Sequence, residues 1–238
     1  MVSYSGVRPK LVSTGMTEID KKIGGGIPEG SFTLIDGQSE AGKSVLAQQF
    51  IWGALNAGFK VALYTTEDTT PSFLRQMASL SFDLTDFFLL GRLNIYPVPN
   101  TFVQNDSLTV FDTLLEHVAS LPDFNLMVVD SLTAFVSHAS EQETLDFFSH
   151  AKDVCGGQHK TMMMTMHSYA VSDQLLMRIR SICDAHLRVR VEEIGAQLMK
   201  ALEVSKVRGA SKQTGNIVNF DIEPHVGIRI IPVTRAKA

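Results

Sequence analysis

Short runs of apolar residues alternate with amphipathic segments along the first two-thirds of the chain. The runs predict strands at 31–35, 60–66, 93–97, 126–129 and 161–166. Between them, apolar residues at helical spacing predict helices at 44–57, from Pro71 onward, at 108–119 and at 144–153. Buried strands that alternate with helices are typical of a parallel sheet covered by helices on both faces.

The last third has a different pattern, in which strand-like segments follow one another. They lie at 186–191, 197–204, 217–222 and 227–231. We expect these segments to extend the central sheet with antiparallel strands. Because no internal repeat, low-complexity segment or Gly/Ser-rich linker divides the sequence, we predict one α/β domain over residues 1–238, with a mostly parallel central sheet.

Composition narrows the class of protein. Hydrophobic residues make up 45% of the 238 residues and charged residues 19%, which is enough apolar material for a folded core. The chain has no apolar run of membrane-spanning length, and its first 15 residues lack the apolar stretch of a signal peptide. Two cysteines, Cys155 and Cys183, make neither a disulfide framework nor a zinc finger. We therefore expect a cytoplasmic protein.

The net charge of −4 hides an uneven distribution. Residues 61–158 carry thirteen Asp and Glu against three Lys and Arg, a local net charge of −10, while the two flanks together carry +6. An acidic middle repels a nucleic-acid backbone, which argues against a nucleic-acid partner. The charges are either ordinary solvated surface or complementary faces of a head-to-tail assembly of identical chains.

A glycine-rich loop of the form G-x-x-x-x-G-K-S follows the first predicted strand. The loop and the start of the next helix comprise Gly37, Gln38, Ser39, Glu40, Ala41, Gly42, Lys43, Ser44 and Val45. Glycines let the backbone turn so that successive N–H groups face phosphate oxygens, and the helix N-terminus adds the positive end of its dipole. Lys43 supplies a charge for the β- and γ-phosphates, and the Ser44 hydroxyl can ligate Mg²⁺. This segment predicts a nucleotide site.

Carboxylates end two other predicted strands. Asp130 closes the apolar strand at 126–129, and Glu67 and Asp68 follow the strand at 60–66. Because the carboxyl ends of parallel strands line one crevice, Asp130 is expected near the phosphate loop, where it can help to hold Mg²⁺. Glu67 or Asp68 can orient or deprotonate the water that attacks the γ-phosphate. The plainer interpretation of all three residues is an acidic turn.

These residues together resemble the KaiC/RadA branch of the RecA-type ATPases. The supporting segments are Thr14-Gly15 with Ile19-Asp20, the glycine-rich turn from Ile23 to Gly30, the phosphate loop, Glu67-Asp68, Asp130-Ser131 and the K-x-R-G segment Lys206-Val207-Arg208-Gly209. They fall in order over residues 11–232. The resemblance implies a RecA-like P-loop NTPase fold that binds ATP with Mg²⁺.

The resemblance also implies roles for three further residues. Lys206 and Arg208 lie two residues apart on a predicted strand, so we expect their side chains on one face. In ring ATPases of this kind, residues at these positions reach the γ-phosphate of the neighbouring subunit, so that ATP links the ring. His167 follows the strand at 161–166, where RecA-type proteins place a polar residue that senses the γ-phosphate. The alternatives are a solvated basic strand end for the pair and a structural role for the histidine.

Within this branch, the single short module resembles the FlaH (ArlH) family, the KaiC-like accessory ATP-binding proteins of the archaellum. That family implies a cytoplasmic ring, expected to be a homohexamer, at the membrane-embedded motor, working with the motor ATPase FlaI and the platform protein FlaJ. KaiC-type ATPases usually carry two adjacent glutamates where this chain has Glu67 and Asp68. Because the shorter Asp68 would hold a base back from its water, we expect ATP to be bound and hydrolysed slowly or not at all.

Two other functions stay open at this point. One is an active KaiC-like ATPase or autokinase, although a second ATPase copy and a clear Ser/Thr target tail are missing. The other is a RadA-like DNA-dependent recombination ATPase, against which the acidic middle of the chain argues.

Overall fold

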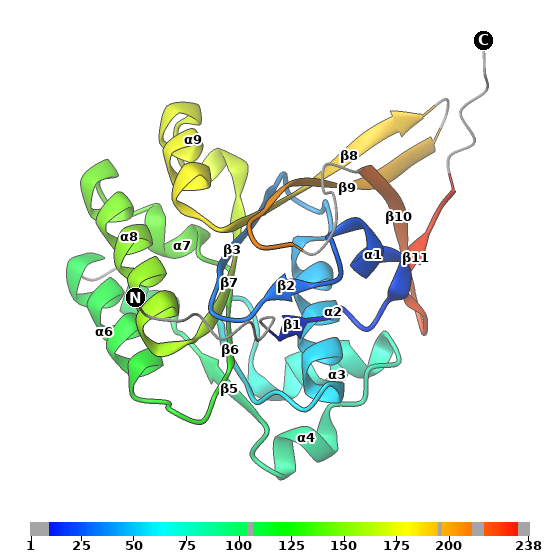
Figure 1. The fold of residues 1–238 in the computed structure, drawn as a ribbon, viewed down its shortest axis with the longest axis horizontal. Helices are drawn as coiled ribbons and strands as arrows, with labels where there is room; N and C mark the ends of the chain where they lie inside the picture. The colour runs from blue at the N-terminus through cyan, green and yellow to red at the C-terminus, as the bar shows by residue number, and fades with distance from the viewer. Residues whose placement is uncertain (1–9, 104–106, 195–196, 211–216, 233–238) are drawn as a thin grey trace, which may run out of the picture.

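The central feature of the fold is a mixed nine-stranded sheet in the order β11-β10-β9-β8-β3-β7-β6-β4-β5 (Figure 1). The computed structural model describes residues 10–103, 107–194, 197–210 and 217–232. The strands of the sheet are β3 (Phe32–Gly37), β4 (Val61–Thr65), β5 (Leu93–Pro97), β6 (Leu126–Asp130), β7 (Thr161–His167), β8 (Ala185–Ile194), β9 (Gln197–Val207), β10 (Ile217–Glu223) and β11 (Gly227–Ile230). A separate antiparallel pair joins β1 (Leu11–Val12) to β2 (Ile27–Pro28).

The directions of the strands confirm the predicted fold class, with one difference. Strands β3 to β8 pair in parallel, and β9, β10 and β11 continue the sheet antiparallel. The antiparallel part thus begins one strand later than expected. The reason is helix α9 (Asp173–Ile182), which the sequence analysis did not predict and which connects β7 to β8 as a parallel crossover.

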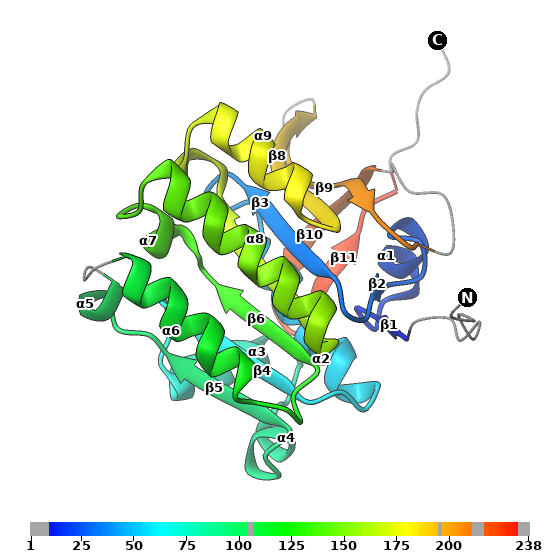
Figure 2. The same ribbon diagram turned by 60° about the vertical axis from the view of Figure 1, so that its left-hand side comes forward.

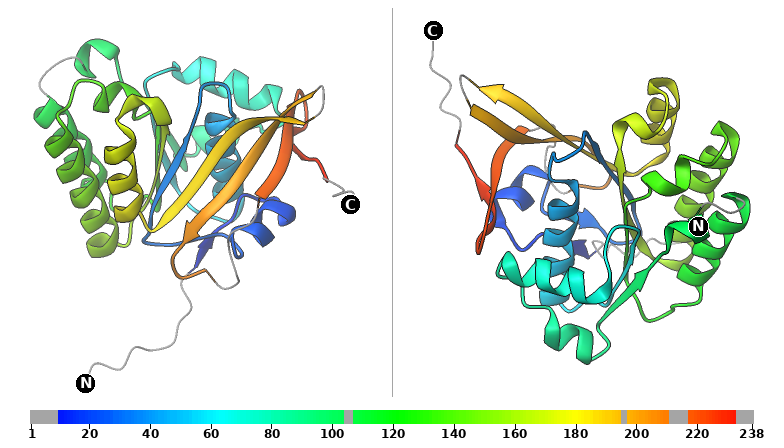
Figure 3. Two further views of the ribbon diagram at one scale, coloured as in Figure 1. Left: turned by 90° about the horizontal axis from the view of Figure 1, so that it is seen from above. Right: turned by 180° about the vertical axis from the view of Figure 1, so that it is seen from behind.

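Helices cover both faces of the sheet. The other helices are α1 (Thr17–Lys22), α2 (Lys43–Asn56), α3 (Thr70–Ser79), α4 (Thr85–Leu89), α5 (Asn100–Val103), α6 (Ser107–Ala119), α7 (Thr133–Val136), α8 (Glu141–Gln158) and a 3₁₀ turn at Ser168–Ala170. Figures 2 and 3 show α6, α8 and α9 side by side over one face, with α2 and α3 on the opposite side. Helix α8 begins earlier than predicted because Ser140 and Glu143 form a capping box at its start, and it continues to Gln158.

The buried side chains form two apolar clusters, one on each face of the sheet. Along β3, Leu34 packs into the cluster under α6 and α8, whereas Ile35 packs into the cluster around α2. The same alternation divides the methionines of β7, since Met163 and Met164 face opposite clusters. Both faces are therefore dry, which explains why these strands have continuous apolar runs. Within the described residues, no helix combines the length and the apolar character needed to cross a bilayer.

Candidate nucleotide-binding site

The phosphate loop lies at the edge of the sheet where the carboxyl ends of β3, β4, β6 and β7 meet. Gly37 ends β3 so close to β8 that an added Cβ would lie 1.9 Å from the carbonyl oxygen of Val189. Gly42 caps α2 with φ of +99°, a left-handed conformation that glycine adopts without a steric penalty. The two glycines therefore meet separate needs, close approach of β8 at one end and the turn into α2 at the other.

Lys43 begins α2 and holds the loop together from inside. Its side chain is buried, and Nζ donates a hydrogen bond of 2.7 Å to the carbonyl oxygen of Gln38. Burial lowers the pKa of Lys43, although the charges of Asp130, Glu67 and Asp36 act in the opposite direction. A cation that is short of solvent at a helix N-terminus is a strong attractor for a phosphate group.

Asp130 faces Ser44 across the crevice, as the parallel sheet predicts. Its Oδ1 atom accepts hydrogen bonds from Ser44 Oγ at 3.1 Å and from Thr165 Oγ1 at 2.5 Å. Burial, and to a smaller extent the charge of Glu67, raise the pKa of Asp130 to about 6, although the two hydroxyls and Lys43 act in the opposite direction. A serine hydroxyl bonded to a dry carboxylate is an oxygen donor set of the kind that Mg²⁺ uses.

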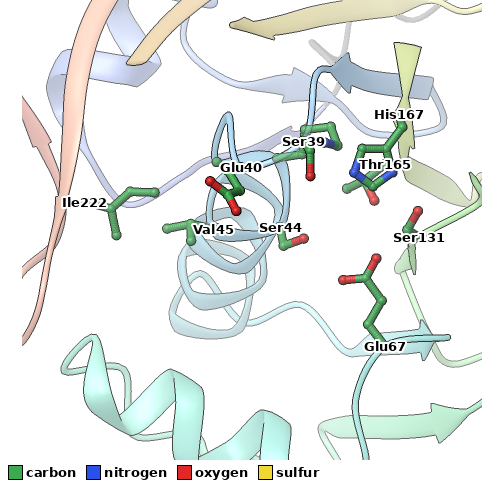
Figure 4. A pocket seen from close by; sticks show the side chains of 11 residues that line it. Ser39, Glu40, Ser44, Val45, Glu67, Ser131, Thr165, His167 and Ile222 are labelled. Carbon is green, nitrogen blue, oxygen red and sulfur yellow. The ribbon is translucent and has the colours of Figure 1, made fainter. Parts of the chain in front are cut away.

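A cavity of about 390 Å³ opens beside the start of α2. Its lining residues are Ser39, Glu40, Gly42, Lys43, Ser44, Val45, Glu67, Ser131, Thr165, His167 and Ile222. Figure 4 shows the carboxylate of Glu67 pointing into this space toward Ser44 and Ser131. Asp68 is not part of this lining; it lines a neighbouring recess of about 290 Å³ with Pro97 and Pro99. Of the two acidic residues proposed as a base, the structure brings only Glu67 to the cavity.

His167 lies at the end of β7, at the rim of the cavity. Its Nδ1 atom is 3.0 Å from Thr133 Oγ1, which also accepts a hydrogen bond of 2.9 Å from the His167 backbone N–H. Burial and then the charge of Lys43 lower the pKa of His167. The ring stacks on the exposed Tyr169, with 5.0 Å between centroids. A neutral imidazole facing Lys43 is suitably placed to respond to an anion bound between them.

The structure does not bring Lys206 and Arg208 to the phosphate loop of their own chain. Lys206 pairs with His186, near the start of β8, whereas the loop follows the far end of β3. Arg208 follows the last residue of β9. Both side chains donate to the carbonyl oxygen of Ser181 at the C-terminal end of α9, at 3.4 and 3.5 Å. They therefore share one side, as predicted, but at a distance from the site.

Three lining residues were missed in the sequence. Thr165 lies between two methionines of β7, and the register places it next to Asp130. Ser131 follows Asp130 after a cis peptide bond and lines the cavity, whereas the sequence analysis assigned it no role in the site. Ile222 comes from β10, and no local motif links it to the loop 180 residues earlier. It forms an apolar wall beside Val45 (Figure 4).

Comparison with known proteins agrees with this geometry. The family model described as "ATPase: KaiC" matches residues 12–235. The archaeal flagellar ATP-binding protein FlaH of Sulfolobus acidocaldarius is 32% identical over 232 residues, covering 96% of this chain and 100% of that protein. FlaH of Methanocaldococcus jannaschii is 28% identical over 214 residues, covering 90% and 91%.

Solved structures give the same result. The crystal structure of the flagellar accessory protein FlaH from M. jannaschii superimposes with a TM-score of 0.82 at 27% identity, covering 94% of this chain and all of that one. A KaiC-like protein from Pyrococcus horikoshii shares the fold, with a TM-score of 0.77 at 20% identity over 94% of this chain and all of that one. The chain therefore belongs to the KaiC family of ATPases and, within that family, to the group named FlaH.

Proposed function

We propose that this protein binds ATP with Mg²⁺ at the phosphate loop and acts as the nucleotide-dependent regulatory subunit of an archaeal flagellar motor. The observation that carries the proposal is a cavity at the start of α2 that is lined by the buried cation Lys43 and by Ser44, whose hydroxyl is bonded to the buried carboxylate of Asp130. Burial lowers the pKa of Lys43 and raises the pKa of Asp130, so both charges cost stability in the free protein. The names of the FlaH relatives support ATP as the nucleotide and the archaellum as the setting.

The residues present fit the proposed ligands. The backbone of the loop, the α2 N-terminus and Lys43 would hold the phosphates, and Ser44 and Asp130 would hold Mg²⁺, which supplies positive charge to the β- and γ-phosphate oxygens. The apolar wall of Ile222 and Val45, on the opposite side of the cavity from Glu67, suits the base or sugar end of a nucleotide.

Slow hydrolysis is part of the proposal. Glu67 reaches the cavity, but within the described part of the chain its carboxylate makes no hydrogen bond that would fix its direction. Asp68 lies in the neighbouring recess. Because a misplaced base costs orders of magnitude in rate, we expect ATP to remain bound for long enough to act as a structural ligand.

We also propose that ATP drives assembly of a homo-oligomeric ring, expected to be a hexamer. Lys206 and Arg208 lie toward the opposite end of the strands from their own phosphate loop, so a nucleotide that meets them belongs to a second copy. Association of this kind is favoured by the affinity that ATP gains from contacting two subunits. In the setting that the FlaH resemblance implies, the ring would act at the membrane beside the motor ATPase FlaI and the platform protein FlaJ.

The test is calorimetric titration with MgATP, together with mass measurement by light scattering with and without the nucleotide. We expect the wild-type protein to bind MgATP and to increase in mass. Lys43→Ala should lose both properties, because nothing else in the loop provides the charge, while Lys22→Ala on the exposed face of α1 should retain them. Unchanged affinity in Lys43→Ala would refute the binding site, and unchanged mass in the wild type would refute nucleotide-linked assembly. Rapid phosphate release would favour the active ATPase instead.

A further inference from the structure

The strand that leads into the phosphate loop is tied to α9 by a buried ion pair. Asp36, the residue before Gly37, is completely buried, and its Oδ2 atom accepts a hydrogen bond of 2.5 Å from the Arg180 guanidinium. Its other oxygen contacts Nε2 of the buried His186. Burial alone would raise the pKa of Asp36, but the hydrogen bonds and charges of His186 and Arg180 outweigh it and lower the pKa. The carboxylate is therefore charged and held from two sides.

The same residue of α9 also holds the K-x-R-G segment. The carbonyl oxygen of Arg180 accepts a hydrogen bond of 2.8 Å from Lys206 Nζ. The next carbonyl, that of Ser181, accepts longer bonds from Lys206 and Arg208, and Arg208 also pairs with Asp184 at 3.5 Å. The last carbonyl groups of a helix lack partners within the helix and attract cations, so the C-terminal end of α9 is well suited to bind two basic side chains.

Arg180 thus connects two places that the fold keeps apart. Its side chain donates a hydrogen bond to Asp36 on the strand before the phosphate loop. Its backbone carbonyl accepts a hydrogen bond from Lys206, which is proposed to reach the next subunit. Arg180 does not line the nucleotide cavity. At its other end, α9 begins shortly after His167 and Tyr169, at the cavity rim. One short helix therefore runs from near the rim of its own cavity, beside His167, toward the basic pair.

We propose that Arg180 is a positioning residue, which fixes Lys206 and Arg208 relative to the phosphate loop of the same chain. This inference rests on the proposed function, because it concerns assembly through nucleotide. Its consequence is that nucleotide-driven self-association depends on Arg180, although Arg180 does not line the nucleotide cavity of its own chain. Binding of nucleotide by a single subunit does not depend on it.

The experiment measures nucleotide binding and assembly separately. A fluorescent ATP analogue is titrated at protein concentrations too low for assembly, and light scattering follows ATP-dependent self-association at higher concentrations. For Arg180→Ala we expect the analogue affinity to stay within about twofold of wild type, while self-association weakens by about tenfold or more. Arg178→Ala, an exposed arginine on the same helix, is the control and should behave as wild type.

Two further variants distinguish positioning from a general loss of stability. Arg180→Lys keeps the charge but not the planar fork, so it should recover part of the self-association and keep a cooperative thermal transition. The double variant of Arg180→Ala with Lys206→Ala should assemble no worse than Lys206→Ala alone, since the first acts through the second. Additive losses, or wild-type assembly in Arg180→Ala, would overturn the inference. A wild-type protein that bound ATP without a change in mass would overturn the proposed assembly itself, and this would be seen before any variant is made.

Discussion

Replacing Asp130 by asparagine should stabilise the nucleotide-free protein while weakening its hold on Mg²⁺. The side chain is buried, and its raised pKa, about 6 against the ordinary 3.8, shows that burial penalises the charged form. Asparagine has the same shape and keeps an oxygen for the hydroxyls of Ser44 and Thr165. The amide carries no charge, so it removes the penalty and also the ligand charge that a divalent cation needs.

The magnitude follows from the difference between the two pKa values. A difference of about 2 units corresponds to about 3 kcal/mol that the charged carboxylate costs the folded state above pH 6. Because the folded pKa is raised, the folded state binds the proton more tightly, and its stability from this group falls as pH rises from about 4 to about 6. In Asp130→Asn, the buried amide N–H groups lack acceptors, which reduces the expected gain in the free energy of unfolding by about 1 to 2 kcal/mol. We therefore expect Asp130→Asn to gain about 1 to 2 kcal/mol at pH 8 and to lose this advantage near pH 4.5.

Urea denaturation of the nucleotide-free protein at pH 4.5 and pH 8 measures this directly. Asp153→Asn, on the exposed surface of α8, controls for the general effect of removing one acidic group. Calorimetry at pH 8 should show that the same variant binds MgATP more weakly than wild type. We expect the affinity to fall by about tenfold or more, as it does when a metal site is weakened by mutation. An Asp130→Asn protein that is less stable than wild type at pH 8, or equally shifted at both pH values, would refute the argument.

Two further predictions concern the loop and the base. Gly37→Ala should destabilise the protein by about 2 to 4 kcal/mol in urea denaturation, because its Cβ would meet the backbone of β8, whereas Gly157→Ala, which meets open space on α8, should be neutral or slightly stabilising. Equal effects of the two would contradict the close approach. The rate of phosphate release, which we expect to be slow, should fall further in Glu67→Gln and stay unchanged in Asp68→Asn, because only Glu67 lines the cavity. The reverse result would assign the role of the base to Asp68.

The parts of the fold that the sequence predicted best are those in which local pattern and burial agree. Strand β5 has the predicted bounds, and β6 is longer than predicted only by Asp130. The reason is that a short apolar run between helices is typical of a strand buried on both faces of a sheet. Helix α9 was not predicted, although the sequence contains both an N-cap residue and a buried apolar stripe for it. Ser172 caps the helix by accepting from the Leu175 backbone N–H, and Leu175, Leu176 and Ile179 form its buried stripe.

The site itself was predictable only as far as motifs are local. The loop is defined by residues adjacent in sequence, and Asp130 follows from the rule that parallel strands end together. Glu67 and Asp68 are neighbours with the same chemistry, and only the turn geometry after β4 sends one into the cavity and the other beside Pro97. Ile222 depends on the register of a strand that joins the sheet four places from β7.

The basic pair shows most clearly what a sequence leaves undetermined. Two residues apart, Lys206 and Arg208 were expected on one side of a strand, and they do share a partner, the carbonyl of Ser181. Which end of the sheet they occupy depends on the antiparallel direction of β9, and that direction separates them from their own nucleotide site. Under the proposed function, a cation placed there would meet the nucleotide of another chain. Lys206 is bonded to the carbonyl oxygen of Arg180, and the Arg180 side chain is paired with Asp36 on the strand before its own phosphate loop. In the proposed assembly, the phosphate loop of one chain and the basic pair that would meet the nucleotide of the next chain are therefore linked through α9, and such a link would couple neighbouring sites in a ring.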